Sequence, residues 1–206
     1  MLTKKIWKFL LLVSINFCFI PNSFAIDPYL FVQETADEAS EALNKRLSKE
    51  EKMEQLKIIA KKTVDIQGIG KYSLGVYRKT ISDQKKDEYF DIFEQYFLKS
   101  FASRLAEYTD PKIRVDSQKK LNEKYTMVSS VLMATEDKPE VKIDWRIVTK
   151  NPDKPLIIDV VIEGVSLAKV QKEEFNSIIQ SNNGDLSLIH ISEPTRRYAI
   201  SYAVFC

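Results

Sequence analysis

The chain has 206 residues, of which 44% are hydrophobic and 29% are charged. This length and composition are typical of one domain with a hydrophobic core. The 31 Lys and Arg are nearly balanced by 29 Asp and Glu, which argues against nucleic acid as a partner. With 5 Gly and two Cys, the chain is neither collagen-like nor a disulfide scaffold.

Residues 1–25 have the pattern of a secretory signal peptide. Three lysines precede an apolar stretch from Phe9 to Ile20, and the triplet Ser23-Phe24-Ala25 places small residues at a cleavage site. The alternative is an uncleaved anchor, but the stretch is shorter than the roughly 20 residues that span a bilayer. Bulky residues before Cys18 disfavour a lipoprotein. We therefore expect cleavage before Ile26 and export to the periplasm.

Residues 186–206 resemble the translation of a sequencing adapter. Leu186 to Arg196 matches a transposase-type adapter, and Ile200 to Cys206 matches the far end of the same adapter in the same reading frame. The alternative is a natural strand, because Tyr198 to Phe205 has strand-forming residue types. We expect the native sequence to stop near Asp185, so that residues 26–185 form a single domain truncated at its C-terminus.

Residues 26–185 contain neither cysteine nor histidine, because Cys18, His190 and Cys206 lie outside this range. Disulfides, Cys or His catalysis, Ser-His-Asp triads and thiolate or imidazole zinc sites are therefore excluded for it. Oxygen-only Ca²⁺ or Mg²⁺ sites stay open, but no EF-hand-like loop occurs. The Gly-Ile-Gly at 68–70 lacks the third glycine of a dinucleotide fingerprint. We expect no metal, no cofactor and no catalytic residue.

The first half of this range has the periodicity and capping residues of helices. Ser48, followed by Glu51 three residues later, forms a capping box. Gly75 stands where a short helix is expected to stop. The predicted helices begin at Asp27-Pro28, cover Lys49–Lys62 and Ile66–Ser73, and extend from Ser82 to about Tyr108, where Asp110-Pro111 ends the longest one.

The second half alternates apolar and polar residues with the period of β-strands. Ile143 and Trp145 face one way, while Asp144 and Arg146 face the other. Such alternation predicts an antiparallel sheet with one covered face. The predicted strands are Lys112–Ser117, Tyr125–Thr135, Val141–Thr149 and Pro155–Glu163, and a final helix covers Leu167–Gln180. The fold class is thus α+β, with helices packed on one face of a curled, mainly antiparallel four-stranded sheet.

Aromatic residues recur at three- and four-residue steps along the longest predicted helix. Phe93, Phe97 and Phe101 share one side of it. Plain core packing explains such a stripe. An alternative is that it faces the branched side chains of the sheet across an apolar cavity, which the fold would then enclose.

Short motifs occur in a fixed order along residues 27–184. They are Asp27-Pro28 with Phe31-Val32, Val64-Asp65, Leu74-Gly75, the spaced Gln84, Tyr89, Phe93 and Phe101, and Asp159-Val160 with Glu163-Gly164-Val165-Ser166-Leu167 and Phe175. Together they resemble the toluene-tolerance (Ttg2-type) or MlaC family of periplasmic phospholipid-binding carriers. Pro155-Leu156 departs from the family pattern, which often has a Trp before the last strand.

The resemblance implies lipid transport rather than catalysis. Family members shuttle phospholipid between an outer-membrane lipoprotein–porin complex and an inner-membrane ABC transporter complex with its substrate-binding subunit. This transport maintains outer-membrane lipid asymmetry and organic-solvent tolerance. Each buried methylene contributes about 0.8 kcal/mol, so acyl chains need shielding from water. The expected lipid-binding residues are Phe93, Phe97, Phe101, Val128, Leu132, Ile143, Trp145, Ile158 and Val160, with the strand face inferred from apolarity alone.

Two other functions stay open from the residues alone. One is an exported enzyme of a cone-shaped α+β fold that uses a buried Asp144 or Asp159 as a general base. Solvent-facing alternation is the simpler explanation for both carboxylates, and the position of Asp159 in the family-like stretch favours a hydrogen-bonding role. The other function is a periplasmic adaptor without a ligand. Phospholipid that co-purifies with the protein would favour the carrier.

Overall fold

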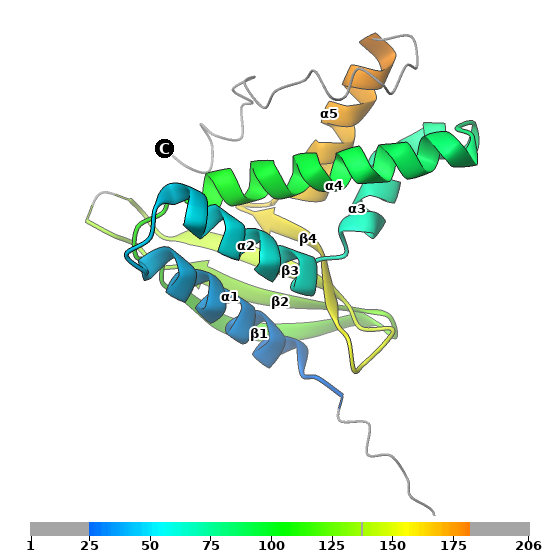
Figure 1. Ribbon diagram of the computed structural model, residues 1–206. Coiled ribbons are helices and arrows are strands. Elements are labelled where there is room, and N and C mark those ends of the chain that lie inside the picture. The colour runs from blue at the N-terminus through cyan, green and yellow to red at the C-terminus, as the bar shows by residue number, and fades with distance from the viewer. Residues whose placement is uncertain (1–24, 137, 182–206) are drawn as a thin grey trace, which may run out of the picture.

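The computed structural model describes residues 25–136 and 138–181. The described part is an α+β domain (Figure 1). Its helices are α1 (Pro28–Asn44), α2 (Lys49–Thr63), α3 (Ile66–Ser73), α4 (Asp83–Leu105) and α5 (Leu167–Ser181), with a 3₁₀ helix η1 (Gly75–Lys79). Its strands are β1 (Ile113–Asn122), β2 (Tyr125–Leu132), β3 (Val141–Val148), β4 (Leu156–Ile162) and β5 (Val165–Ser166). The predictions for residues 1–24 and 186–206 lie outside the described residues.

Capping side chains set the helix starts. The Asp27 carboxylate accepts a hydrogen bond from the Tyr29 backbone N–H at 2.8 Å. Ser48 and Glu51 form both halves of the predicted capping box. The longest helix, α4, begins after Ser82 as predicted but ends at Leu105, three residues before the predicted end at Tyr108.

All described strands form one antiparallel sheet in the order β1-β2-β3-β4-β5. The prediction of four strands was one short. The fifth, Val165–Ser166, pairs with β4 after a tight turn at Glu163 and Gly164, whose φ angles are +47° and +83°. Positive φ at both central residues is the geometry of a two-residue hairpin turn. A two-residue strand leaves no alternation to detect in the sequence.

A β-bulge in β4 changes which residues face the helices. Arg146 on β3 pairs with Asp159, but the next residue, Ile147, pairs with Ile157. Ile158 is therefore the extra residue of the bulge. The simple alternation predicted Ile158 on the same face as Val160, whereas the structure aligns Ile157 with the buried Ile147.

Three hydrophobic clusters hold the layers together. Phe93 of α4 and Phe175 of α5 belong to the first, Val128 of β2 and Val32 of α1 to the second, and Leu56 of α2 to the third. Figure 1 shows α1, α2 and α4 lying next to one another on one side of the sheet, with α5 beyond α4. Within residues 25–136 and 138–181, no helix combines the length and apolarity needed to cross a membrane.

Candidate functional site: a cavity between helices and sheet

A cavity of about 250 Å³ lies between the helices and the sheet. Its wall takes residues from all five α-helices and from strands β1 to β4. All three hydrophobic clusters contribute, for example through Ile69, Ile157 and Leu56. The cavity therefore occupies the place where the clusters meet, and its lining is mostly apolar.

The α4 side of the cavity is an aromatic ladder. The Phe97 and Phe101 rings line the cavity and stack with 5.9 Å between centroids and 7° between planes. Phe93 stacks on Phe97 at 6.1 Å, but its own side chain is 1% exposed and belongs to the hydrophobic cluster with Phe175. Of the three phenylalanines expected to bind lipid, the structure thus brings two to the cavity.

The sheet side presents four of the six expected strand residues: Leu132, Ile143, Trp145 and Val160. Trp145 and Val160 stand directly opposite each other on β3 and β4. Val128 is fully buried in the cluster beneath α1, and Ile158 sits at the bulge, so neither lines the cavity. Ile157 and Ile162 do line it although we did not expect them to.

Residues of α1 and α2 form a further part of the cavity wall, which was not predicted from the sequence. Thr35 and Thr63 are the polar members deepest in this wall, and each hydroxyl donates to a carbonyl of its own helix, that of Phe31 at 2.7 Å and that of Ile59 at 2.8 Å. These hydroxyls therefore offer no free donor to the cavity. The available signal was a set of small and apolar residues at helical spacing: Thr35, Ala36, Ala39, Ser40 and Leu43.

Polar groups gather where α4 and α5 border the cavity. The Tyr96 hydroxyl of α4 donates to Oε1 of Glu174 on α5 at 2.7 Å, and Nε2 of Gln171 donates to Oε2 of the same carboxylate at 3.3 Å. Burial raises the pKa of Tyr96 well above its ordinary value, and the Glu174 carboxylate raises it further. Tyr96 therefore stays a protonated donor at physiological pH.

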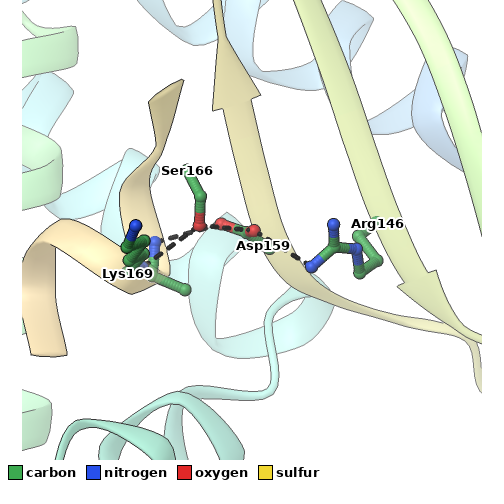
Figure 2. Close-up of polar contacts among 5 residues, drawn as sticks. Arg146, Asp159, Ser166 and Lys169 are labelled. Carbon is green, nitrogen blue, oxygen red and sulfur yellow. Dashed lines mark hydrogen bonds and ion pairs between the residues drawn. The ribbon is translucent and has the colours of Figure 1, made fainter. Parts of the chain in front are cut away.

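Asp159 anchors the start of α5 to β4 (Figure 2). Its side chain, 4% exposed, accepts hydrogen bonds from Ser166 Oγ at 2.7 Å and from the Ala168 backbone N–H at 3.0 Å. Arg146 on β3 approaches the same carboxylate at 3.4 Å. The Ser166 hydroxyl oxygen in turn accepts from the backbone N–H of Lys169 at 3.1 Å. This network favours a structural role for Asp159.

The other candidate general base, Asp144, lies apart from the cavity lining. Its carboxylate accepts a hydrogen bond from the hydroxyl of Ser129 on the neighbouring strand. In the part of the chain that the structure describes, no group of three or more His, Cys, Asp or Glu side chains is arranged to hold a metal ion. What this geometry provides is an apolar chamber with a polar border.

Comparisons with known proteins identify the family of the chain and a solved structure with a similar fold. The family model described as MlaC protein matches residues 33–190. A solved structure of a phospholipid-binding protein from Ralstonia solanacearum, in complex with a phospholipid, is similar with a TM-score of 0.67 and 15% sequence identity. The similarity covers 81% of this chain and 94% of that chain, and it shows a shared fold. No curated protein matches the chain. Because the family model spans more than half of its length, the chain belongs to the MlaC family.

Proposed function

We propose that this protein binds a phospholipid in the cavity and carries it across the periplasm between membrane complexes. The observation that carries the proposal is the chamber between α4 and the sheet, whose wall is largely apolar and includes Phe97, Phe101 and Trp145. Acyl chains placed there leave water, and each methylene contributes about 0.8 kcal/mol. Membership in the MlaC family and the phospholipid bound by the Ralstonia solanacearum protein support this ligand class.

The size of the cavity indicates how loading would proceed. A volume of about 250 Å³ lies just below the 300–1,000 Å³ that is common for ligand pockets. Entry of acyl chains therefore requires the walls to separate. Separation is feasible because the walls belong to separate hydrophobic clusters, each of which can keep its own packing while the space between them widens.

The proposed lipid contacts are the cavity-lining members of the set expected from the sequence: Phe97, Phe101, Leu132, Ile143, Trp145 and Val160. Phe93, Val128 and Ile158 would act indirectly, by supporting this lining. As partners we propose the outer-membrane lipoprotein–porin complex and the inner-membrane ABC transporter complex that serve the family. Partner-driven release is needed because full burial of acyl chains would otherwise hold the lipid too tightly.

A transfer assay tests the carrier. Donor vesicles that contain a phospholipid with a fluorescent acyl chain are mixed with unlabelled acceptor vesicles, and protein purified from cells expressing the full chain is added. The expected result is a transfer rate that rises in proportion to protein concentration, because each molecule shields one lipid at a time. A rate that stays at the value of spontaneous exchange at every protein concentration would contradict the proposal.

A further inference from the structure

Two large apolar side chains stay exposed where α3 and η1 border α5. Val76 of η1 is 76% exposed, the highest value among the large hydrophobic residues that the structure describes, and Tyr72 of α3 is 46% exposed. Their neighbours Leu74 and Tyr77 pack into the first hydrophobic cluster. The core therefore covers one side of this segment and leaves Tyr72 and Val76 outside it.

Lys172 of α5 joins these two residues into one surface. Its ammonium group lies 4.8 Å from the centroid of the Tyr72 ring. Its Cε would lie 3.4 Å from a Cβ added at Gly75, so the start of η1 lies directly against α5. Because Val76 follows Gly75, an aromatic ring, an apolar side chain and a cation from three helices share this surface.

The charge along this segment has one sign. Residues 66–82 include Lys71, Arg78 and Lys79 and no acidic residue. All three cations are exposed. In a 3₁₀ helix, side chains three residues apart eclipse each other, so Lys79 lies on the same side of η1 as Val76. Positive charge therefore accompanies the exposed apolar groups.

These cations are not neutralised by ion pairs. Within residues 25–136 and 138–181, the structure pairs none of the three, nor Lys172, with an acidic side chain. The acidic groups at the borders of the segment have other partners: Asp83 pairs with Lys86 at 2.8 Å, and Glu173 pairs with Lys169 at 3.9 Å. The positive charge is thus available to an anionic surface.

We propose that this surface docks the protein on the head groups of an anionic phospholipid bilayer. The docking surface consists of Lys71, Tyr72, Val76, Arg78, Lys79 and Lys172. Anionic head groups attract clustered cations, and the interface accepts aromatic and apolar side chains beside them. A bilayer suits this surface better than an acidic protein, because mobile head groups adapt to separate apolar groups without a matching shape.

The docking surface adds a membrane contact to the proposed carrier function. The two helices that carry most of it also contribute to the cavity wall, through Ile69 of α3 and Val170 of α5. Docking would therefore bring the bilayer against helices that enclose the proposed lipid chamber. Binding to a vesicle surface and lipid held in the cavity are measured separately, so the two proposals can fail independently.

Vesicle flotation tests the docking surface. Protein purified from cells expressing the full chain is mixed with vesicles of phosphatidylcholine alone or of phosphatidylcholine and phosphatidylglycerol in equal amounts, and the fraction that floats with the vesicles is measured. The variants are Lys79→Gln and Val76→Ser. Their matched controls are Lys119→Gln, at an exposed position of the opposite edge strand β1, and Ile58→Ser, at an exposed position of α2.

The wild type should bind the vesicles with phosphatidylglycerol more strongly than those without it, and added salt should weaken this binding. Lys79→Gln should lower the affinity about fivefold, because one cation near an anionic bilayer contributes about 1 kcal/mol. Val76→Ser should lower it about threefold, since its apolar surface no longer leaves water. Both controls should bind like the wild type, and circular dichroism checks that every variant is folded.

Equal flotation with both kinds of vesicle, or Lys79→Gln binding at the wild-type level, would overturn the docking surface. Absence of flotation combined with binding of polyglutamate that Lys79→Gln weakens would assign the surface to an acidic protein and would also overturn the proposal. Phospholipid extracted from a wild type that does not float would leave the carrier function intact. Flotation by a wild type that yields no phospholipid would support docking and contradict the carrier.

Discussion

The backbone N–H of Ala168 donates a 3.0 Å hydrogen bond to Oδ1 of Asp159, which joins the first turn of α5 to strand β4. The same carboxylate accepts from the hydroxyl of Ser166. One buried side chain therefore satisfies donors at the start of the helix that forms one wall of the cavity. The geometry of that wall therefore depends on a polar contact between two residues that themselves line the cavity.

Replacement of Asp159 by Ala should destabilise the domain by about 2 kcal/mol, because the partly buried Ala168 N–H and Ser166 hydroxyl would lose their acceptor. Urea unfolding followed by circular dichroism measures the change. Asp87→Ala, at an exposed position of α4, is the control and should stay within about 0.5 kcal/mol of the wild type. Equal stability of the Asp159→Ala protein and the control would show that this anchor is dispensable.

The sequence predicted the helix starts well because their causes are local. Ser48 and Glu51 sit three residues apart and satisfy each other's backbone groups whatever the rest of the chain does. The end of α4 was predicted less well. No local stop signal distinguishes Leu105 from Tyr108, so the helix was extended to Asp110-Pro111.

The site was predicted in part, and the misses depend on pairing and packing between elements. Trp145 reaches the cavity together with Ile143, as the alternation of β3 predicts, and Val160 lies opposite Trp145 on β4. Ile158 does not reach the cavity, because the bulge that displaces it is a property of pairing between β3 and β4 and leaves no mark in β4 alone. Likewise, the stripe on α4 cannot distinguish Phe97 at the cavity from Phe93 in the core, since helix spacing places both on one side.

The capping box of α2 should make stability depend on pH. Hydrogen bonds from the backbone and hydroxyl of Ser48 lower the pKa of Glu51 below its ordinary value of 4.5. A pKa that is lower in the folded state adds stability above the unfolded value, and this stability is lost as pH falls through the folded value.

The difference in unfolding free energy between the wild type and Glu51→Ala should therefore be constant above about pH 5 and shrink below pH 4.5. Urea unfolding across this range measures it. Glu50→Ala, one residue earlier at an exposed position, serves as the control. A difference that grows as the solution becomes more acidic would contradict the assigned contact.

A charge placed in the cavity should act differently from a charge placed in the core. Val160 is half-buried and lines the cavity, so Val160→Asp should leave the protein folded while co-purified phospholipid falls. Val128 is 0% exposed beneath α1, and Val128→Asp should unfold the domain, at a cost of several kcal/mol. Thermal unfolding and lipid extraction test the pair. A folded Val160→Asp protein that retains its phospholipid would refute this placement of the acyl chains.

Export predicts a defined N-terminus. If residues 1–25 are a signal peptide, the mature protein begins at Ile26, and intact-mass spectrometry of protein recovered from the periplasm should show it. Replacing Ala25 by a bulky residue such as Phe should block cleavage, while Asn22→Gln should leave it unchanged. A mature protein that still carries residues 1–25, or a lipid on Cys18, would contradict soluble export.

The most direct test of the carrier is to extract the purified protein with organic solvent and identify the released molecules by mass spectrometry. The account predicts phospholipid bound to the wild type, at up to one molecule per chain. It also predicts a marked loss in Ala39→Phe, where a ring fills space at the α1 wall, and no loss in the exposed control Ala134→Phe. A folded wild-type protein that yields no phospholipid, or an Ala39→Phe protein that yields as much as the wild type, would contradict lipid binding in this cavity.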